Sequence, residues 1–253
     1  MSTKRSTNKQ WRTIWAFLRN HPRAYVGKQA ACRRVISGVH WVLRTGAQWR
    51  EMPERYGKWN TVYKRFARWE EKGVWQALFA HVADDPDLES VMPDGSVIRA
   101  PMCAAGGSRK HGSQAEQSLG KSQGGFSTKI HVLVDALGNP LRFRLTGGQR
   151  HESTQADALL GGFAFDFVIA AKAYDSDALR KTIAECGAEA VIPPRSNRTK
   201  PVAYDQHLYK ERHLVECLFN KLKWCRRIAT RYDKLAQCYL AFLHFASTLL
   251  WLT

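Results

Sequence analysis

The chain has 253 residues, 44% of them hydrophobic, and a formal net charge of +17 at pH 7. It is long enough for one large domain or a main domain with a smaller partner, and its charge favours a polyanionic partner such as nucleic acid. Six cysteines without a CxxC pair argue against a disulfide framework and a zinc finger, and the polar N-terminal residues exclude a signal peptide.

The positive charge is concentrated in the first third of the chain. Residues 1–83 hold 17 lysines and arginines against 4 acidic residues, together with seven of the nine tryptophans. Apolar residues at three- and four-residue steps predict four helices here, over residues 11–20, 29–44, 58–71 and 74–82. Thr45-Gly46 is expected to end the second helix, because glycine tolerates a left-handed cap.

The third helix carries a basic face between its apolar positions. Helices joined by short turns, with such a face on a later helix, resemble a helix-turn-helix arrangement that contacts DNA. The alternative is a helical bundle with a solvated basic surface. On the first interpretation the DNA-binding residues of this region are Lys58, Lys64, Arg65 and Arg68.

The hydrophobic pattern changes after the polar stretch DDPDLES at residues 84–90, which predicts a linker. Strands are expected over 91–98, 129–135, 141–145, 167–170 and 190–192, and helices over 153–160, 176–186 and 204–227. Residues 106–125 are rich in Gly, Ser and Gln and predict a mobile loop. Three antiparallel strands followed by crossover units predict an α/β fold, a mixed sheet with helices on both faces. We therefore expect a helical domain at 1–83, a linker at 84–90 and an α/β domain at 91–253.

The last apolar stretch, residues 235–252, is the most hydrophobic of the chain. It contains Gln237, His244, Ser247 and Thr248 and is barely long enough to cross a bilayer. We expect a buried terminal helix here rather than a membrane span.

Two places in the α/β region can carry chemistry. On a regular helix, four residues of 204–227 fall within an arc of about 60°, opposite an apolar face: Tyr209, Arg212, Glu216 and Lys223. Such a carboxylate can bind a metal ion while its cationic neighbours hold phosphate, or it can simply pair with Arg212 on an exposed face. Asp94 lies at an apolar strand, where an unpaired charge is costly, although it can also begin a turn with Gly95.

Many ordered motifs of the chain resemble one family. They include PDGSVIRA, GGFSTKIHVLVDALGNP, LTGGQRHE, VIAAKAYDSDALR, VIPPRSNR and the spacing Tyr209-x2-Arg212-x3-Glu216-x6-Lys223. These motifs, with RTGAQWREMPERYGKWNTVYKRFARW in the basic region, resemble the DDE transposases of bacterial insertion sequences, in the insertion sequence five family with its Tyr-Arg-Glu-Lys signature. The resemblance covers essentially the whole chain.

The resemblance implies a ribonuclease-H-like core in which two Asp and one Glu bind two Mg²⁺ (or Mn²⁺) ions. The first Asp corresponds to Asp94 and the Glu to Glu216, but Ala171 stands at the position of the second Asp, and a methyl group cannot bind a metal ion. We do not expect another acid to replace this ligand, although three acids lie in nearby segments: Asp135, Asp166 and Asp175. We therefore expect the chain to bind DNA and to cleave it poorly or not at all.

The resemblance also implies the partners. Tyr209, Arg212 and Lys223 resemble residues that position the phosphates of DNA ends, and Lys172, beside the gap, either contacts phosphate or is merely solvated. Double-stranded DNA is expected as the partner, as terminal inverted repeats and as target. We expect a homo-oligomer, specifically a dimer, to act on this DNA. We expect it in the bacterial cytoplasm, with no membrane partner.

Two other interpretations remain open. The first is a non-catalytic DNA-binding protein, such as a repressor derived from a transposase. The retention of Asp94, Arg212, Glu216 and Lys223 weighs against long drift of that kind. The second is a nuclease of similar fold that does not transpose DNA, because fold alone does not separate these activities.

Overall fold

The computed structural model describes residues 7–105, 116–122, 124–200 and 202–253. Its internal contacts divide the chain into two compact units. Unit 1 comprises Met1–Asp84, Arg99–Ser113 and Leu222–Thr253, and unit 2 comprises Asp85–Ile98 and Gln114–Lys221. Each unit is therefore built from segments that are not continuous in the sequence.

Unit 1 is helical. Its first helices are α1 (Asn8–Asn20), α2 (Gln29–Thr45), α3 (Trp59–Glu71) and α4 (Val74–Val82), with the short 3-10 turns η1 (Trp49–Glu51) and η2 (Glu54–Tyr56) between α2 and α3. Gly46 ends α2 at φ 68° and Gly73 separates α3 from α4 at φ 68°, a left-handed conformation that favours glycine. All four predicted helices are confirmed, and the end of α2 at Gly46 follows the predicted cap.

The core of unit 1 also contains the end of the chain. The last helix, α10 (Ala236–Trp251), packs on α3 and α4, and α9 (Arg226–Ala229) packs on α2. The Phe66 and Phe242 rings are 4.5 Å apart, and the Trp75 and Phe245 rings 5.1 Å apart. The expectation of a buried terminal helix is confirmed, and within the described residues no helix has the length and apolarity to cross a membrane.

This grouping differs from the continuous domains expected from the sequence. Residues 222–253 were assigned to the α/β domain, yet their contacts place them in unit 1. These residues group with unit 1 because the apolar and aromatic side chains of α10 pack against those of α3 and α4 and bury them. The functional boundaries at 1–83, 84–90 and 91–253 stay a prediction.

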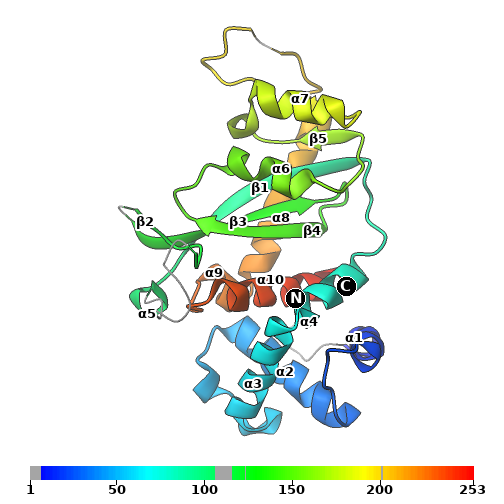
Figure 1. Ribbon diagram of the computed structural model, residues 1–253, viewed down its shortest axis with the longest axis vertical. Helices are drawn as coiled ribbons and strands as arrows, with labels where there is room; N and C mark the ends of the chain where they lie inside the picture. The colour runs from blue at the N-terminus through cyan, green and yellow to red at the C-terminus, as the bar shows by residue number, and fades with distance from the viewer. Residues whose placement is uncertain (1–6, 106–115, 123, 201) are drawn as a thin grey trace. The chain divides into compact units, whose positions relative to one another are not determined.

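Unit 2 is built on a mixed sheet of six strands (Figure 1). The strands are β1 (Ser90–Arg99), β2 (Gly120–Ser122), β3 (Gly125–Val134), β4 (Pro140–Gly147), β5 (Phe167–Ile169) and β6 (Glu189–Val191). Their order is β2-β3-β1-β5-β6, with β4 paired to β3. β3 is antiparallel to β2 and β4, whereas β5 is parallel to β1 and β6, as the mixed sheet predicted from the sequence requires.

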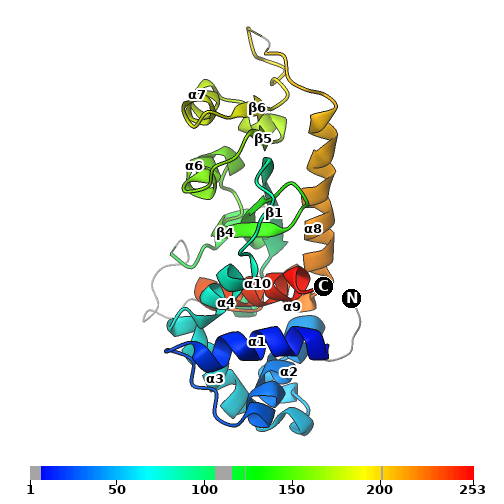
Figure 2. The same ribbon diagram turned by 90° about the vertical axis from the view of Figure 1, so that its right-hand side faces the viewer.

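Helices cover both faces of this sheet. Figure 2 shows α6 (Ala156–Leu160) and α7 (Asp177–Glu185) on one side of the strands and α8 (His213–Lys223) on the other. Three 3-10 turns, η4 (Glu152–Gln155), η5 (Lys172–Tyr174) and η6 (Leu208–Arg212), lead into α6, α7 and α8. The predicted arrangement of helices on both faces is confirmed.

Two sequence expectations about elements were wrong. The helix expected over 204–227 is divided into η6, α8 and α9. At its start, the Asp205 carboxylate accepts hydrogen bonds from the N–H groups of His207 and Leu208, which fixes a turn. At its end, Cys225 has extended backbone angles (φ −83°, ψ 103°), so the helix cannot continue. In the stretch expected to be a mobile loop, β2 forms an antiparallel pair with β3, while residues 106–115 and 123 lie outside the described residues.

Candidate active site

Arg212 brings together the two carboxylates that the sequence singles out. Asp94 lies in β1, and its Oδ2 accepts a hydrogen bond of 3.0 Å from Arg212 Nη1. Arg212 ends η6, and its Nη2 donates to Oε1 of Glu216, one turn further on in α8. Tyr209 and Arg212 are three residues apart in η6. Residues at this spacing point in the same direction in a 3-10 helix, so the two side chains still share one face.

Asp94 is the more buried of the two acids. Its side chain is 14% exposed, against 58% for Glu216. Burial raises the pKa of Asp94, and the Glu152 carboxylate adds to the increase, while the Gly95 N–H at 2.8 Å and the Arg212 guanidinium oppose it. Burial acts to lower the pKa of Arg212, but the carboxylates of Asp94 and Glu216 raise it. Arg212 therefore stays positively charged between these two acids.

Ala171 follows the strand that lies next to β1 and runs parallel to it. Ser90 pairs with Phe167 and Val91 with Val168, and Ala171 comes two residues after Ile169, the last residue of β5. Ala171 caps η5, where its carbonyl accepts a hydrogen bond of 2.8 Å from Tyr174 N–H. A methyl group therefore stands at the carboxyl end of β5, where parallel sheets place their chemistry.

The three acids considered as replacements have other positions. Both oxygens of Asp175 are used: Oδ1 by Arg180 and Arg198, each at 2.9 Å, and Oδ2 by the Arg195 N–H. Asp135 accepts the N–H groups of Leu137 and Asn139 and so holds the turn after β3. Asp166 is exposed and precedes β5 at its opposite end. None of the three adds a carboxylate beside Ala171.

Sequence reasoning missed two residues around Asp94, namely Glu152 and Tyr174. Glu152 packs on Gly95, since a Cβ added to that glycine would lie 2.8 Å from Glu152 Cγ, and its Oε1 is 3.4 Å from Lys129 Nζ. The Tyr174 hydroxyl is buried and has no hydrogen-bond partner among the described residues. Burial raises the pKa of Tyr174, and Glu152 and Asp94 raise it further. Glu152 belongs to the motif LTGGQRHE, but nothing in the sequence pattern places it beside Asp94.

The donors present do not fit a centre for two divalent ions. Such ions take oxygen ligands, and Mg²⁺ binds through one or two carboxylates together with phosphate and water. Asp94 and Glu216 offer carboxylates, but Arg212 already binds an oxygen of each, and Ala171 offers none. Within the part of the chain that the structure describes, no three His, Cys, Asp or Glu side chains are placed to hold a metal ion.

Other predicted DNA-binding residues are Lys172 and Tyr209 of unit 2 and Lys223, which the contacts assign to unit 1, and all are at least partly exposed. Lys172 is exposed at η5, next to Ala171, and Tyr209 is half-buried with its ring 5.5 Å from that of Tyr204. Lys223 is the last residue of α8 and is exposed. The surface position of these residues is compatible with phosphate contacts, which stay a prediction.

The basic residues of α3 are also accessible. Lys58 caps the helix, and Lys64 and Arg68 are exposed along it. Arg65 is half-buried, donates a hydrogen bond to the Val26 carbonyl at 3.2 Å and lies over the Tyr25 ring. Lys64, Arg65 and Arg68 line a hollow of about 180 Å³ together with the exposed Tyr25, so three of the four predicted residues share one surface.

Two family models match the chain. One, described as "Putative transposase of IS4/5 family (DUF4096)", matches residues 7–79. The other, described as "Transposase DDE domain", matches residues 94–250. Together they span nearly the whole chain, and the interval between them contains the polar stretch at 84–90.

Two relatives are proteins of bacterial insertion elements, and one of them is described as a transposase. The "Putative transposase for insertion sequence element IS6501" of Brucella ovis is 44% identical over 129 residues, which cover 50% of this chain and 99% of the relative. The "Insertion element IS402 uncharacterized 16.2 kDa protein" of Burkholderia cepacia is 33% identical over 76 residues, 27% of this chain and 52% of the relative.

A solved structure shares the fold. The chain resembles the cryo-EM structure of the piggyBac transposase synaptic complex with hairpin DNA, with a TM-score of 0.50 and 10% sequence identity. The similarity covers 98% of this chain and 66% of the other. Together with the DDE domain match and the mixed sheet, it confirms the expected ribonuclease-H-like fold.

Proposed function

Because the chain belongs to the transposases of the IS4/5 family that carry a DDE domain, we propose that it binds the terminal inverted repeats of an insertion sequence but cleaves them poorly or not at all. By family it is a DNA transposase, and DNA is its partner. The proposal concerns the activity of this particular chain, in which Ala171 replaces an expected carboxylate.

The position of Ala171, just past the carboxyl end of the strand that pairs in parallel with β1, is the observation that carries the proposal. A family active site there would present carboxylates from β1, β5 and α8. In this chain the β1 and α8 carboxylates are linked by Arg212, and the β5 position has only a methyl group. DDE transposase domains generally use divalent metal ions, so the missing oxygen ligand affects cleavage directly, whereas DNA binding depends on other residues.

The DNA-binding residues proposed for this chain belong to two groups. Lys58, Lys64, Arg65 and Arg68 on α3 supply a basic helix face, which suits the major groove or the phosphate backbone. Tyr209, Arg212, Lys223 and Lys172 would position the phosphates at the DNA end, and arginine suits this role because its planar guanidinium binds phosphate through two hydrogen bonds.

A homo-oligomer, a dimer, is the proposed assembly on DNA, because two ends must be brought together before they can be joined to a target. Mg²⁺ or Mn²⁺, as two ions, is the proposed metal requirement of a version with an acid at position 171. The bacterial cytoplasm is the proposed place of action.

The proposal is tested by measuring binding and nicking on the same DNA. Duplexes that carry the ends of the insertion sequence encoding this chain are compared with shuffled duplexes, with Mg²⁺ and with Mn²⁺. We expect end-specific binding without metal-dependent nicking. Efficient nicking by the chain with Ala171 would contradict the disabled site, and equal binding to shuffled duplexes would contradict recognition of the ends.

The transposase-derived repressor is distinguished by a second comparison. If Ala171 is a single lesion in an intact site, restoring Asp at this position returns metal-dependent nicking. If the site has drifted further, the Ala171→Asp variant binds the ends and stays inactive, and the repressor interpretation then replaces the one proposed here.

A further inference from the structure

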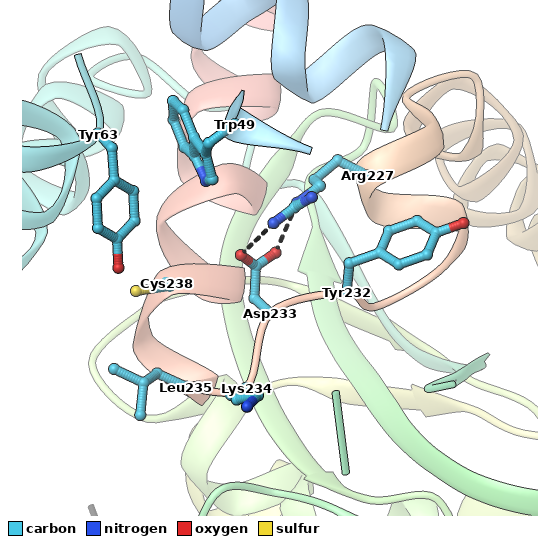
Figure 3. Close-up of a pocket in the computed structure, with 8 residues that line it drawn as sticks. All are labelled: Trp49, Tyr63, Arg227, Tyr232, Asp233, Lys234, Leu235 and Cys238. Carbon is cyan, nitrogen blue, oxygen red and sulfur yellow. Dashed lines mark hydrogen bonds and ion pairs between the residues drawn. The ribbon is translucent and has the colours of Figure 1, made fainter. Parts of the chain in front are cut away.

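Unit 1 contains a hollow whose walls are unusually aromatic. It has a volume of about 410 Å³, within the range of roughly 300–1,000 Å³ typical of small-ligand pockets. Its lining comes from η1, α3, α9, α10 and the loop between α9 and α10 (Figure 3), and consists of Trp49, Tyr63, Arg227, Tyr232, Asp233, Lys234, Leu235 and Cys238. A second hollow shares Trp49, Arg227 and Tyr232 with it.

An ion pair divides the aromatic rings into two groups. The Arg227 Nε and Nη2 atoms donate to the two carboxylate oxygens of Asp233 at 3.0 and 2.8 Å, and both side chains are 8% exposed. Figure 3 shows Trp49 and Tyr63 on one side of this pair and Tyr232 on the other. The pair is neutral as a whole, so the floor of the hollow is polar without carrying a net charge.

Two of the lining aromatic residues are partly exposed. Tyr63 is 37% exposed and Tyr232 42% exposed, which is high for large aromatic side chains in a helical unit. Burial raises the pKa of Cys238 to about 12, and Asp233 and Glu70 add to the effect, so this thiol contributes no negative charge. Lys234 is exposed at the edge of the hollow.

These features select a ligand class. A phosphate does not suit the floor, because the buried Arg227 is already neutralised by Asp233 and the carboxylate would repel an anion. A flat, neutral group with polar edges suits it, since aromatic side chains stack on planar rings. One lining residue, Tyr63, comes from α3, the helix that also carries the basic residues Lys64, Arg65 and Arg68.

We propose that this hollow holds one unstacked nucleobase of the bound DNA, with Tyr63, Trp49 or Tyr232 against its face and Lys234 near the adjoining phosphate. The inference rests on the proposed DNA function but adds a site to it. It requires that the chain bind DNA in which one base is outside the helix more tightly than fully paired DNA.

The test uses the full chain and two duplexes of the same sequence, one of which contains a single unpaired 2-aminopurine. Emission of this base falls when it stacks on an aromatic ring, so the measurement gives both affinity and base position. We expect at least about fivefold tighter binding to the bulged duplex, the lower end of what one aromatic–base stack contributes, together with quenching of the emission.

Two alanine variants separate the hollow from the rest of unit 1. Tyr232→Ala removes an exposed lining ring, and the matched control Trp224→Ala removes a ring that is 57% exposed and does not line the hollow. Tyr232→Ala should bind the bulged and the paired duplex equally, without quenching of the 2-aminopurine emission, and should keep its affinity for the paired duplex. Trp224→Ala should keep the preference for the bulged duplex, the quenching and the affinity for paired DNA. A thermal unfolding midpoint close to that of the parent chain shows that each variant is folded.

The outcomes distinguish this inference from the proposed function. Equal binding of the parent chain to both duplexes, or a preference that survives in Tyr232→Ala, overturns the base site and leaves the DNA function intact. Failure to bind either duplex overturns both, since a chain that does not bind DNA cannot hold one of its bases.

Discussion

At the scale of single residues, Arg212 links the two carboxylates of the candidate site, those of Asp94 and Glu216. This arginine therefore supplies the positive charge that compensates a largely buried carboxylate. Without Arg212, Asp94 would keep the unfavourable neighbour Glu152 and lose its guanidinium partner. Removing one partner of a buried pair costs more than the pair itself contributes, because the other charge stays buried.

This leads to a first prediction. Arg212→Gln should lower the free energy of unfolding by about 1–3 kcal/mol, the range for leaving a buried polar group unsatisfied. The control is Lys181→Gln, which breaks the exposed pair with Glu185, whose side chains are 78% and 64% exposed, and should change stability by less than about 0.5 kcal/mol. Urea unfolding of the three proteins measures the difference. A similar decrease in the free energy of unfolding in both variants would show that the ion pairs of Arg212 stabilise the protein no more than an exposed ion pair does.

Asp175 illustrates a different role for a buried acid. It is 3% exposed. Burial acts to raise the pKa of Asp175, but the Arg195 N–H and the guanidinium groups of Arg180 and Arg198 prevail and lower it. A carboxyl group whose pKa is lowered on folding stabilises the protein above its ordinary pKa, and this stability is lost as the pH falls through the folded value.

The second prediction therefore depends on pH. Asp175→Asn should destabilise the chain by about 3–5 kcal/mol at pH 7, as expected for breaking a buried ion pair. The difference from the parent chain should shrink as the pH falls below about 4, the ordinary range of Asp. Asp177→Asn is the control, since Asp177 also pairs with Arg198 but its side chain is 88% exposed. A difference that does not vary between pH 7 and pH 3 would contradict the role given to the charge of Asp175.

At the scale of elements, helices with strong local signals were predictable from the sequence. The predicted end of α2 and the break between α3 and α4 both lie at glycines with positive φ. The single helix expected over 204–227 was not found, because the sequence shows neither the turn fixed by the Asp205 carboxylate nor the extended backbone at Cys225. Such features depend on hydrogen bonds and packing that hydrophobic periodicity does not contain.

The two helix-ending glycines give a third prediction. Gly46 and Gly73 both have φ of 68°, but a Cβ at Gly46 would lie 3.0 Å from Arg226 Cβ, whereas nothing lies within 4 Å at Gly73. Gly73→Ala should cost about 1–2 kcal/mol for the left-handed conformation alone. Gly46→Ala should cost more, because α9 must also move. Thermal unfolding measures the loss of stability in both variants. Equal losses would show that α9 moves away from a methyl group at position 46 without a loss of stability.

At the scale of the whole molecule, the compact units do not follow the order of the sequence. Rings of α3 and α4 pack on Phe242 and Phe245 of α10, so the first helices have an incomplete core without the end of the chain. The charge and composition of residues 1–83 indicated a separate helical region but not this dependence, since the sequence does not show which apolar surfaces meet.

A fourth prediction tests the dependence directly. A fragment of residues 1–90 should lack a cooperative thermal transition, because the apolar faces of α3 and α4 are exposed to water. The same fragment joined through a flexible linker to residues 222–253 should unfold cooperatively. Circular dichroism and near-ultraviolet signals measure both. Cooperative unfolding of the shorter fragment would show that residues 1–83 form an independent domain, as the sequence suggested.

The candidate site was partly predictable at this scale as well. Asp94, Arg212 and Glu216 were identified from residue type, spacing and family resemblance, and the fold brings them together through two hydrogen bonds. Glu152 and Tyr174 were not, because their approach to Asp94 depends on the loop after β4 and on the packing of η4 against η5. Spacing along one helix can be derived from sequence, whereas the meeting of loops cannot.

A single missing carboxylate at position 171 is proposed to separate DNA binding from DNA cleavage. The decisive experiment compares Ala171→Asp with Ala171→Asn, a variant of nearly the same shape that lacks the charge, in a nicking assay on end-carrying DNA with and without Mg²⁺. We expect that only Ala171→Asp nicks the DNA, that it does so only with the metal ion, and that both variants bind the ends as the parent chain does. Nicking by the parent chain at the rate of Ala171→Asp would contradict this proposal.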